Sequence, residues 1–178
     1  MRKWTQLLAL FIGLQLSAQE AEWTSIKDIN PFIGTGGHGH THPSAQAPFG
    51  MIQLGPNTRY DGWDGCGGYH YTDSAMYGFT CTHLSGTGVS DYGDLLILPY
   101  SSPTKEGDHI KFFKEDEHAQ AGYYACILDD GTRIEATAGD RTGILRIRFG
   151  EGSEPGIMVD LNFRDRVLKK SFEATGIG

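Results

Sequence analysis

The chain has 178 residues and a formal net charge of −7, from 22 acidic residues against 15 Lys and Arg residues. An acidic chain has no electrostatic attraction for a phosphate backbone, so we expect no nucleic-acid partner. A chain of this length can bury one hydrophobic core, and one domain is the simplest organisation.

The first 18 residues have the pattern of an export signal. Arg2 and Lys3 form a short positive region. The apolar run at residues 7–16 is too short to span a bilayer, and Ala18 offers a small-residue cleavage point. We therefore expect an exported protein, periplasmic or secreted, whose mature part is residues 19–178 and which has no membrane partner once the signal is removed.

Residues 62–94 have the most unusual composition of the chain. They contain one Trp, five Tyr or Phe, two His, two Cys and four Asp among many Gly, and no Lys, Arg or Glu. Small residues let the backbone approach a ligand, aromatic rings offer flat apolar faces, and short polar groups form directional hydrogen bonds. A sugar ring, with an apolar face and several hydroxyls, suits such a surface. The composition equally suits Gly-rich, aromatic-stabilised loops that cap a β-sandwich.

The rest of the chain shows strand patterns and no sustained helical stripe. Residues 95–98 and 157–161 are short apolar runs that fit strands buried on both faces. Asp-Asp-Gly at residues 129–131 is a turn signal between two strand-like runs. Residues 133–138 and 145–149 alternate between apolar and polar side chains, as strands with one buried face do. The predicted fold class is all-β.

Three long motifs carry a resemblance to a known family. They are DINPFIGTGGHGHTHPSAQAPFGMIQLGPNTR at residues 28–59, GWDGCGGYHY at 62–71 and THLSGTGVSDYGD at 82–94, with a looser match over residues 118–149. In this order they are similar to the N-terminal domain of glycoside hydrolase family 92. Members of that family are calcium-dependent exo-α-mannosidases that invert the anomeric configuration.

The resemblance implies an antiparallel β-sandwich of the galactose-mutarotase-like supersandwich type, followed in the family by a large (α/α)6 barrel. Strand signals continue to the end of the sequence, so we expect an incomplete sandwich and no barrel, as in a truncated chain. In the family, the catalytic acid, the base and most Ca²⁺ contacts come from the helical domain. We therefore assign no catalytic residue and no metal ligand, expect this chain alone to be inactive, and count the missing helical catalytic domain among its partners.

The resemblance also assigns a substrate-binding role to part of the Gly-rich segment. The implied ligand is a terminal α-mannose of a mannose-containing glycan, in α-1,2 or related linkages of N-glycans or mannans. Trp63 is expected to lie against the apolar face of the sugar, and Cys66 beside the subsite for the leaving sugar. Gly67 departs from many relatives, which carry Ser, and should loosen this turn. The residues expected to line the pocket are Trp63, Gly65, Cys66, His83 and Asp91.

Two alternatives from other functional classes stay open. One is a stand-alone carbohydrate-binding β-sandwich, which would keep the aromatic loop and need no catalytic partner. The other is a metal hydrolase built on His38, His40 and His42, because alternate residues of an extended chain point to one face and His can bind zinc or iron. A fourth ligand would be a carboxylate or another His from elsewhere in the chain, and His70 and His83 are candidates. The alternative is a structural role, in which these histidines hydrogen-bond loops together at the interface with the missing domain.

The three cysteines are an odd number, so in an oxidising compartment at least one thiol is free or paired outside the chain. Cys126 lies in a strand-like run and is most simply a buried small hydrophobe. Cys66 could pair with Cys81 or stay a thiol, and the family resemblance favours the free thiol.

Four aspartates, at positions 61, 64, 73 and 91, fall at irregular spacings, unlike the ligands of an EF-hand loop. We interpret Asp61, Asp64, Asp73 and Asp91 mainly as loop-shaping residues that accept backbone hydrogen bonds.

Overall fold

The computed structural model describes residues 26–84, 86, 91–101, 108–151, 154–161 and 163. These residues form strands β1 to β10 and three short 3₁₀ helices, η1 (Ile26–Asp28), η2 (Trp63–Gly65) and η3 (Lys114–Asp116). Within the described ranges there is no α-helix, and no helix long and apolar enough to cross a membrane. The expected export signal at residues 1–18 lies outside the described residues.

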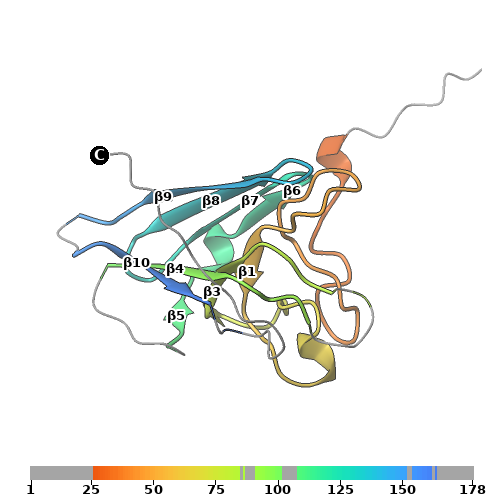
Figure 1. Cartoon of the computed structure of the whole chain (residues 1–178), viewed down its shortest axis with the longest axis horizontal. Coiled ribbons are helices and arrows are strands. Elements are labelled where there is room, and N and C mark those ends of the chain that lie inside the picture. The colour runs from red at the N-terminus through yellow and green to blue at the C-terminus, as the bar shows by residue number, and fades with distance from the viewer. Residues whose placement is uncertain are drawn as a thin grey trace, which may run out of the picture.

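Two four-stranded antiparallel sheets form the body of the molecule (Figure 1). The first sheet has the order β1-β3-β4-β10, with strands Gly55–Asn57, Gly78–Thr80, Leu96–Tyr100 and Gly156–Asp160. The second has the order β6-β7-β8-β9, with strands His118–Gln120, Tyr123–Ile127, Arg133–Ala138 and Gly143–Arg148. A small two-stranded sheet pairs β2 (Ala75–Met76) with β5 (Ile110–Lys111). The predicted all-β, antiparallel β-sandwich is confirmed.

The second sheet follows directly from the sequence pattern. The Asp-Asp-Gly turn joins β7 to β8, and Gly131 adopts the left-handed φ of 81° that this turn requires. In β8 the apolar Ile134 and Ala136 are buried, while Arg133 and Thr137 are exposed. Glu135 breaks the alternation, because it is nearly buried by its partners Tyr123 and Arg146.

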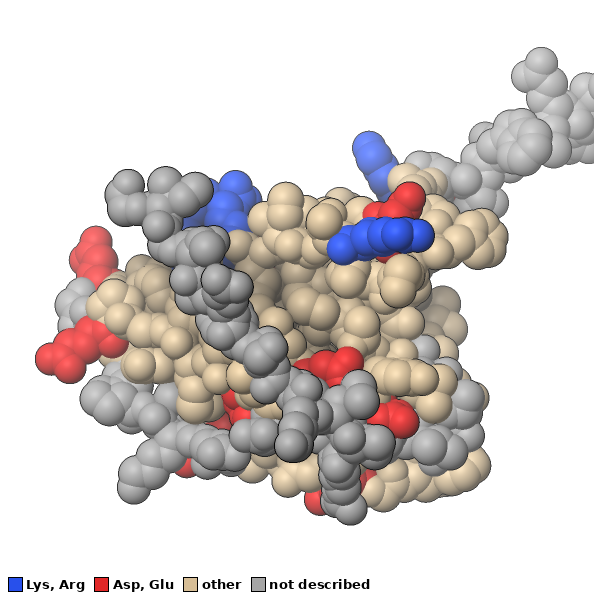
Figure 2. Space-filling view, in the orientation of Figure 1, with Lys and Arg blue, Asp and Glu red and all other residues tan. Residues whose placement is uncertain are grey.

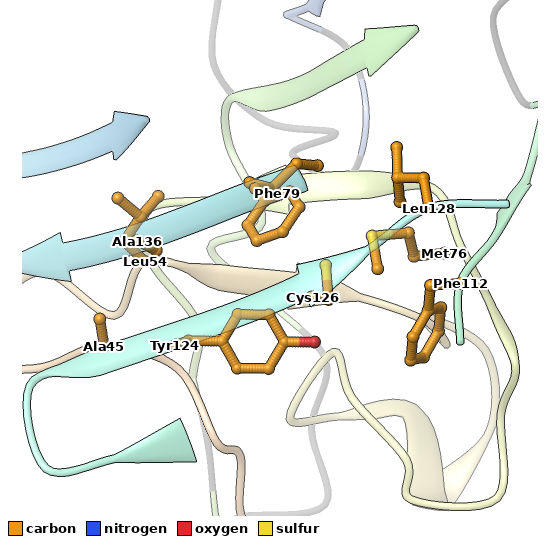
Figure 3. Packing of buried hydrophobic residues seen from close by; sticks show 10 residues of the cluster. Ala45, Leu54, Met76, Phe79, Phe112, Tyr124, Cys126, Leu128 and Ala136 are labelled. Carbon is orange, nitrogen blue, oxygen red and sulfur yellow. The ribbon is translucent and has the colours of Figure 1, made fainter. Parts of the chain in front are cut away.

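The hydrophobic core lies between the two sheets. Phe79 of β3 and Tyr124 of β7 meet there, with ring centroids 6.0 Å apart (Figure 3). Since these rings come from opposite sheets, their contact holds the two layers together. The other buried members of this cluster are Ala45, Leu54, Met76, Phe112, Cys126, Leu128, Ile134 and Ala136.

The prediction of strands buried on both faces is wrong for β10. The strand itself forms, yet Ile157 and Val159 are exposed. The reason is its position: β10 is the last strand of its sheet in the described residues, so it has a neighbouring strand, β4, on one side only. In β4 the prediction holds more closely, with Leu96 and Leu98 buried and Ile97 partly buried.

A buried ionic cluster fastens the Gly-rich segment to the second sheet. Glu117 accepts hydrogen bonds from the hydroxyls of Tyr69 (2.9 Å) and Tyr124 (2.8 Å) and forms an ion pair with Lys114 (2.6 Å). Burial, and then the charge of Glu117, raise the pKa of Tyr69 far above its ordinary range, so its hydroxyl stays protonated and donates. Each polar group therefore has a partner, as a buried cluster requires.

Charged side chains are spread unevenly over the surface. On the face in Figure 2 the Lys and Arg side chains form separate groups along the upper side, one of them directly beside Asp or Glu side chains, and further Asp and Glu side chains lie at the left and in the lower half. This face therefore carries no continuous basic surface among the described residues.

Candidate functional site

Two Gly-rich segments, residues 34–41 and 62–71, lie together at one end of the sandwich (Figure 1). We call them the rim. Hydrogen bonds join them: Tyr71 donates its N–H to the carbonyl of Thr35 at 2.9 Å, and the side-chain Nε2 of His70 lies 3.2 Å from the carbonyl of Gly37. The rim thus brings together residues that are some thirty positions apart in the sequence.

The tight turn around η2 depends on two glycines. Gly62 and Gly68 have φ values of 74° and 76°, in the region that L side chains rarely adopt. The N–H of Gly65 donates to Gly62 and the N–H of Gly68 donates to Gly65, at 3.2 and 3.0 Å. The carbonyl of Gly68 then accepts the N–H of Thr58 at 2.7 Å. The turn is therefore closed by main-chain bonds and presents Trp63 at its tip.

His83 is packed against the inner side of this turn. A Cβ atom on Gly68 would lie 2.3 Å from Cε1 of His83 and 2.8 Å from Oδ1 of Asn57, so only glycine fits. His83 Nε2 lies 3.0 Å from Asn57 Nδ2 and 2.6 Å from Thr80 Oγ1. This buried polar group joins the turn to strands β1 and β3 and fixes its height above the first sheet.

The five residues expected to line a sugar pocket differ in exposure. Trp63 is 61% exposed, and Asp91 is also exposed. Gly65, Cys66 and His83 are buried, Cys66 with no exposed surface at all. The structure therefore groups Trp63, Gly65 and Cys66 in one turn, with His83 behind it. In this chain the burial of Cys66 and His83 favours supporting positions over the direct contact that the sequence suggested.

Asp91 belongs to a neighbouring loop. Its carboxylate accepts the N–H of Tyr92 at 2.9 Å, and its carbonyl accepts the N–H of Leu84 at 3.0 Å. These bonds shape the loop, as the sequence predicted for this residue.

For two other aspartates the expectation of backbone hydrogen bonds is wrong. Asp73 binds the side chains of Arg59 (2.5 Å) and Thr58 (2.9 Å). Asp64 binds two histidine side chains. Both aspartates sit beside cationic or ring-nitrogen partners from distant loops, which spacing along the sequence cannot reveal.

The cysteines are all free thiols, as the resemblance favoured. Cys126 is buried in β7, and burial raises its pKa to about 12, so it acts as a small hydrophobe. Burial also raises the pKa of Cys81. Neither thiol is a nucleophile at neutral pH.

His38, His40 and Asp64 form a cluster at the rim. His38 Nδ1 lies 2.7 Å and His40 Nε2 3.2 Å from the same Asp64 oxygen. The hydrogen bond from His38, followed by that from His40, holds the pKa of Asp64 below its ordinary value. The ring of His40 also contacts Trp63 edge-on, with centroids 5.0 Å apart. The cluster therefore adjoins the exposed tryptophan.

The sequence prediction of three histidines on one extended face is wrong. His40 has a left-handed φ of 56°, and the N–H of Gly39 donates to the carbonyl of Gly36, so the chain turns here. A Cβ on Gly39 would lie 1.9 Å from the carbonyl oxygen of Gly34, which makes glycine obligatory. This turn brings His38 and His40 together, and His42 is not part of the cluster.

The suggested fourth ligands also lie elsewhere. His70 is bonded to Thr72 Oγ1 at 2.9 Å and to the carbonyl of Gly37, and His83 to Asn57 and Thr80. Asp64 is the member of the cluster that the sequence did not connect with the histidines. The sequence feature that could have identified Asp64 is its position next to Trp63, in a segment with few other charged residues.

The metal that the resemblance implies is calcium, which prefers six to eight oxygen ligands. Within the described residues, the one convergence of three or more His, Cys, Asp or Glu side chains is His38, His40 and Asp64. Two of its three donors are nitrogens, so these residues do not fit calcium.

A hollow of about 640 Å³ lies outside the rim, next to β8 and the loop before β1. It is lined by no His, Cys, Asp or Glu, so it holds no group for acid–base or metal chemistry. Its lining residues are Ile26, Gln46, Ala47, Pro48, Phe49, Ala121, Gly122, Thr137 and Ala138.

Comparison with known proteins decides the family. A model of the glycosyl hydrolase family 92 N-terminal domain matches residues 28–176. The chain belongs to glycoside hydrolase family 92. The α-mannosidase BT3965 of this family, from Bacteroides thetaiotaomicron, is 38% identical and superposes with a TM-score of 0.74 over 79% of this chain. It has also been solved in complex with mannoimidazole.

Other family 92 relatives agree. The inverting mannosidase BT2199 from Bacteroides thetaiotaomicron VPI-5482 is 27% identical, with a TM-score of 0.68 over 76% of this chain and 19% of its own. An uncharacterized secreted glycosidase of Arthroderma benhamiae is 28% identical over 175 residues, which are 89% of this chain and 22% of the relative. The chain covers 20% of BT3965. It thus spans about a fifth of the length of these relatives, within their N-terminal domain.

Proposed function

We propose that this domain forms part of the sugar-binding wall of an exo-acting, inverting, calcium-dependent α-mannosidase. Its ligand is a terminal α-mannose of a mannose-containing glycan, with α-1,2 or related linkages of N-glycans or mannans as the substrate class. A relative named as a secreted glycosidase and the export pattern of residues 1–18 support action outside the cytoplasm, in the periplasm or as a secreted protein.

The observation that carries this proposal is the exposed ring of Trp63. Trp63 is 61% exposed, so much of this residue is accessible to a ligand. Here the ring stands on a turn fixed by Gly62, Gly68 and the buried His83, so it is held in place before any ligand arrives. A rigid aromatic face with hydrogen-bonding groups nearby suits the apolar face of a sugar.

The residues around Trp63 have graded roles in this proposal. A Cβ atom on Gly65 would lie 3.0 Å from the carbonyl carbon of Tyr60, so glycine lets the turn pass close to that main chain. Cys66 fills the space inside the turn, and His83 supports it from the sheet. Asp91 shapes the neighbouring loop and offers an exposed carboxylate to sugar hydroxyls.

The chemistry of inversion is assigned to residues outside this domain. It needs one carboxylic acid and one carboxylate on opposite sides of the scissile bond, about 6.5–9.5 Å apart. The two carboxylates with distant partners near the rim, Asp64 and Asp73, are held by histidines and by an arginine. Both carboxylates are thus engaged by side chains of this domain, and the acid and the base are expected from the helical domain of the family.

The experiment that tests the proposal uses the isolated chain with methyl α-mannoside at tens of millimolar. We expect the Trp63 indole N–H resonance in a ¹H–¹⁵N spectrum to shift with mannoside and much less with methyl α-glucoside, its epimer at C2. An aryl α-mannoside should not be hydrolysed, with or without calcium. Equal shifts with both sugars, or none at Trp63, would contradict the binding role. Turnover of the aryl α-mannoside would contradict the assignment of the catalytic acid and base to the helical domain.

A further inference from the structure

The rim holds a second feature that the sugar-binding role does not use. His38, His40 and Asp64 each offer one ligand atom, and these three atoms all lie within 4.8 Å of one another. We propose that they form a binding site for a divalent transition metal of the zinc class, with a fourth position open to water or to an oxygen of a bound ligand. This proposal does not rest on the sugar-binding role.

The spacing of the three donors suits a metal with little movement. Zinc binds histidine nitrogen at about 2.0–2.1 Å and carboxylate oxygen at about 2.0–2.2 Å, so two donors of a tetrahedral site lie roughly 3.3–3.5 Å apart. His38 Nδ1 and His40 Nε2 lie 2.7 and 3.2 Å from Asp64 Oδ1. A bound ion would need the His38–Asp64 pair to separate by about 0.6–0.8 Å and the His40–Asp64 pair by about 0.1–0.3 Å. The two histidine nitrogens, which lie within 4.8 Å of each other, would need to adopt the same spacing.

Two of the three ligands are held in position by their surroundings. The side chain of His40 is 7% exposed, and its ring contacts Trp63. Its carbonyl accepts the N–H of Gly86 at 3.2 Å, which fixes the backbone on the other side. Asp64 lies in η2, inside the closed turn. His38, with a side chain 81% exposed, is the outer ligand and leaves an approach from solvent.

The donor set selects the class of metal. Two imidazoles and one carboxylate suit zinc, iron or similar ions, whereas calcium and magnesium prefer oxygen ligands throughout. Three protein ligands are also the number that leaves an exchangeable position in zinc sites. The family resemblance disfavoured histidine ligation because it implies calcium, and the sequence did not show that Asp64 lies beside both histidines.

The site would join the two segments of the rim. His38 and His40 come from the first segment and Asp64 from the second, so one ion would cross-link the two segments next to the contact of His40 with Trp63. Metal binding is then expected to stabilise the turn that presents the tryptophan, because an ion that binds the folded state alone shifts the folding equilibrium.

The test is zinc binding by the chelator-treated chain, produced without a histidine tag, in competition with a chromophoric chelator. We expect one zinc ion per chain, and at least a tenfold lower affinity in His38→Gln and in Asp64→Asn. His118→Gln is the matched control, since His118 is exposed on β6 and outside the cluster. Its affinity should equal that of the parent chain.

Cobalt(II) gives a second measurement at the same site. The parent chain should show the intense visible absorption of a four-coordinate cobalt complex, and His38→Gln should not. His38→Gln is the safer variant because the side chain is exposed and its loss leaves the packing of η2 intact. The proposal is overturned if the parent binds zinc no better than His38→Gln does, or if excess calcium displaces the zinc.

Discussion

The sandwich and the rim are built by different forces. In the sandwich, antiparallel ladders satisfy the backbone, and contacts such as Phe79 with Tyr124 bury apolar surface between the sheets. In the rim no residue lies in a strand, and the shape comes from turns, left-handed glycines and polar contacts such as that of His70 with the carbonyl of Gly37. The sandwich is stabilised by many small, similar contributions, whereas the rim depends on a few positions that have no substitute.

This difference indicates where function can be altered without loss of the fold. A change at an exposed rim residue such as Trp63 removes no core contact, so it should alter binding alone. A change at a supporting rim residue such as Gly68 should displace the turn, and a change in the core should destabilise the whole domain. The following predictions test these distinctions.

The largest effect is expected for Phe79→Ala in the core. Removal of a fully buried phenylalanine costs about 3–5 kcal/mol of folding free energy, since a cavity remains between the sheets. Urea denaturation followed by circular dichroism measures this loss. Ile144→Thr, on the exposed side of β9, is the control and should change stability by no more than about 0.5 kcal/mol. Similar effects for both variants would refute the assignment of the core.

A smaller loss, confined to the rim, is expected for Gly68→Ala. The left-handed backbone and the overlap with His83 together should cost about 2–4 kcal/mol. Gly62→Ala shares the positive φ but has open space around its Cβ position, so strain alone should cost about 1–2 kcal/mol. Thermal unfolding of both variants tests the pair, and a Gly62 variant as unstable as the Gly68 variant would contradict the role of His83.

The outer face of the second sheet provides the smallest effect, a dependence on pH. The hydrogen bond from Arg146, followed by that from Tyr123, lowers the pKa of Glu135 to about 2. Because the folded-state pKa is depressed, the stabilisation is complete above the ordinary glutamate pKa of about 4.3 and is lost as the pH falls towards about 2. Unfolding midpoints of the parent and of Glu135→Gln, measured between these limits, should converge at low pH. A constant difference would contradict the ion pair.

The sandwich could be predicted from the sequence to a large extent. Period-two alternation in residues 133–138 and the Asp-Asp-Gly turn located β8 and its hairpin with β7. Alternation records which face is buried, and that information is local. It failed for β10, because an apolar run does not reveal whether its strand is central or at an edge.

The rim could be recognised from its sequence but not constructed from it. The motifs around Trp63 identified the family, which the family match to residues 28–176 confirms. The turn at His40 and the approach of Asp64 to two histidines depend on tertiary contacts between segments that no periodicity relates. For the same reason the burial of Cys66 was not foreseen: a residue between two glycines can face either way.

The central claim is that Trp63 contacts the sugar, and the most direct measurement is the kinetics of Trp63→Ala in a full-length family 92 enzyme carrying this domain. We expect kcat/KM for a mannose disaccharide to fall by about tenfold or more, equivalent to about 1.4 kcal/mol, with an unchanged unfolding midpoint. Trp63→Phe, which keeps a flat ring, should lose less. Unchanged kinetics in a stably folded Trp63→Ala enzyme would contradict the claim and leave Trp63 as a structural residue of the rim.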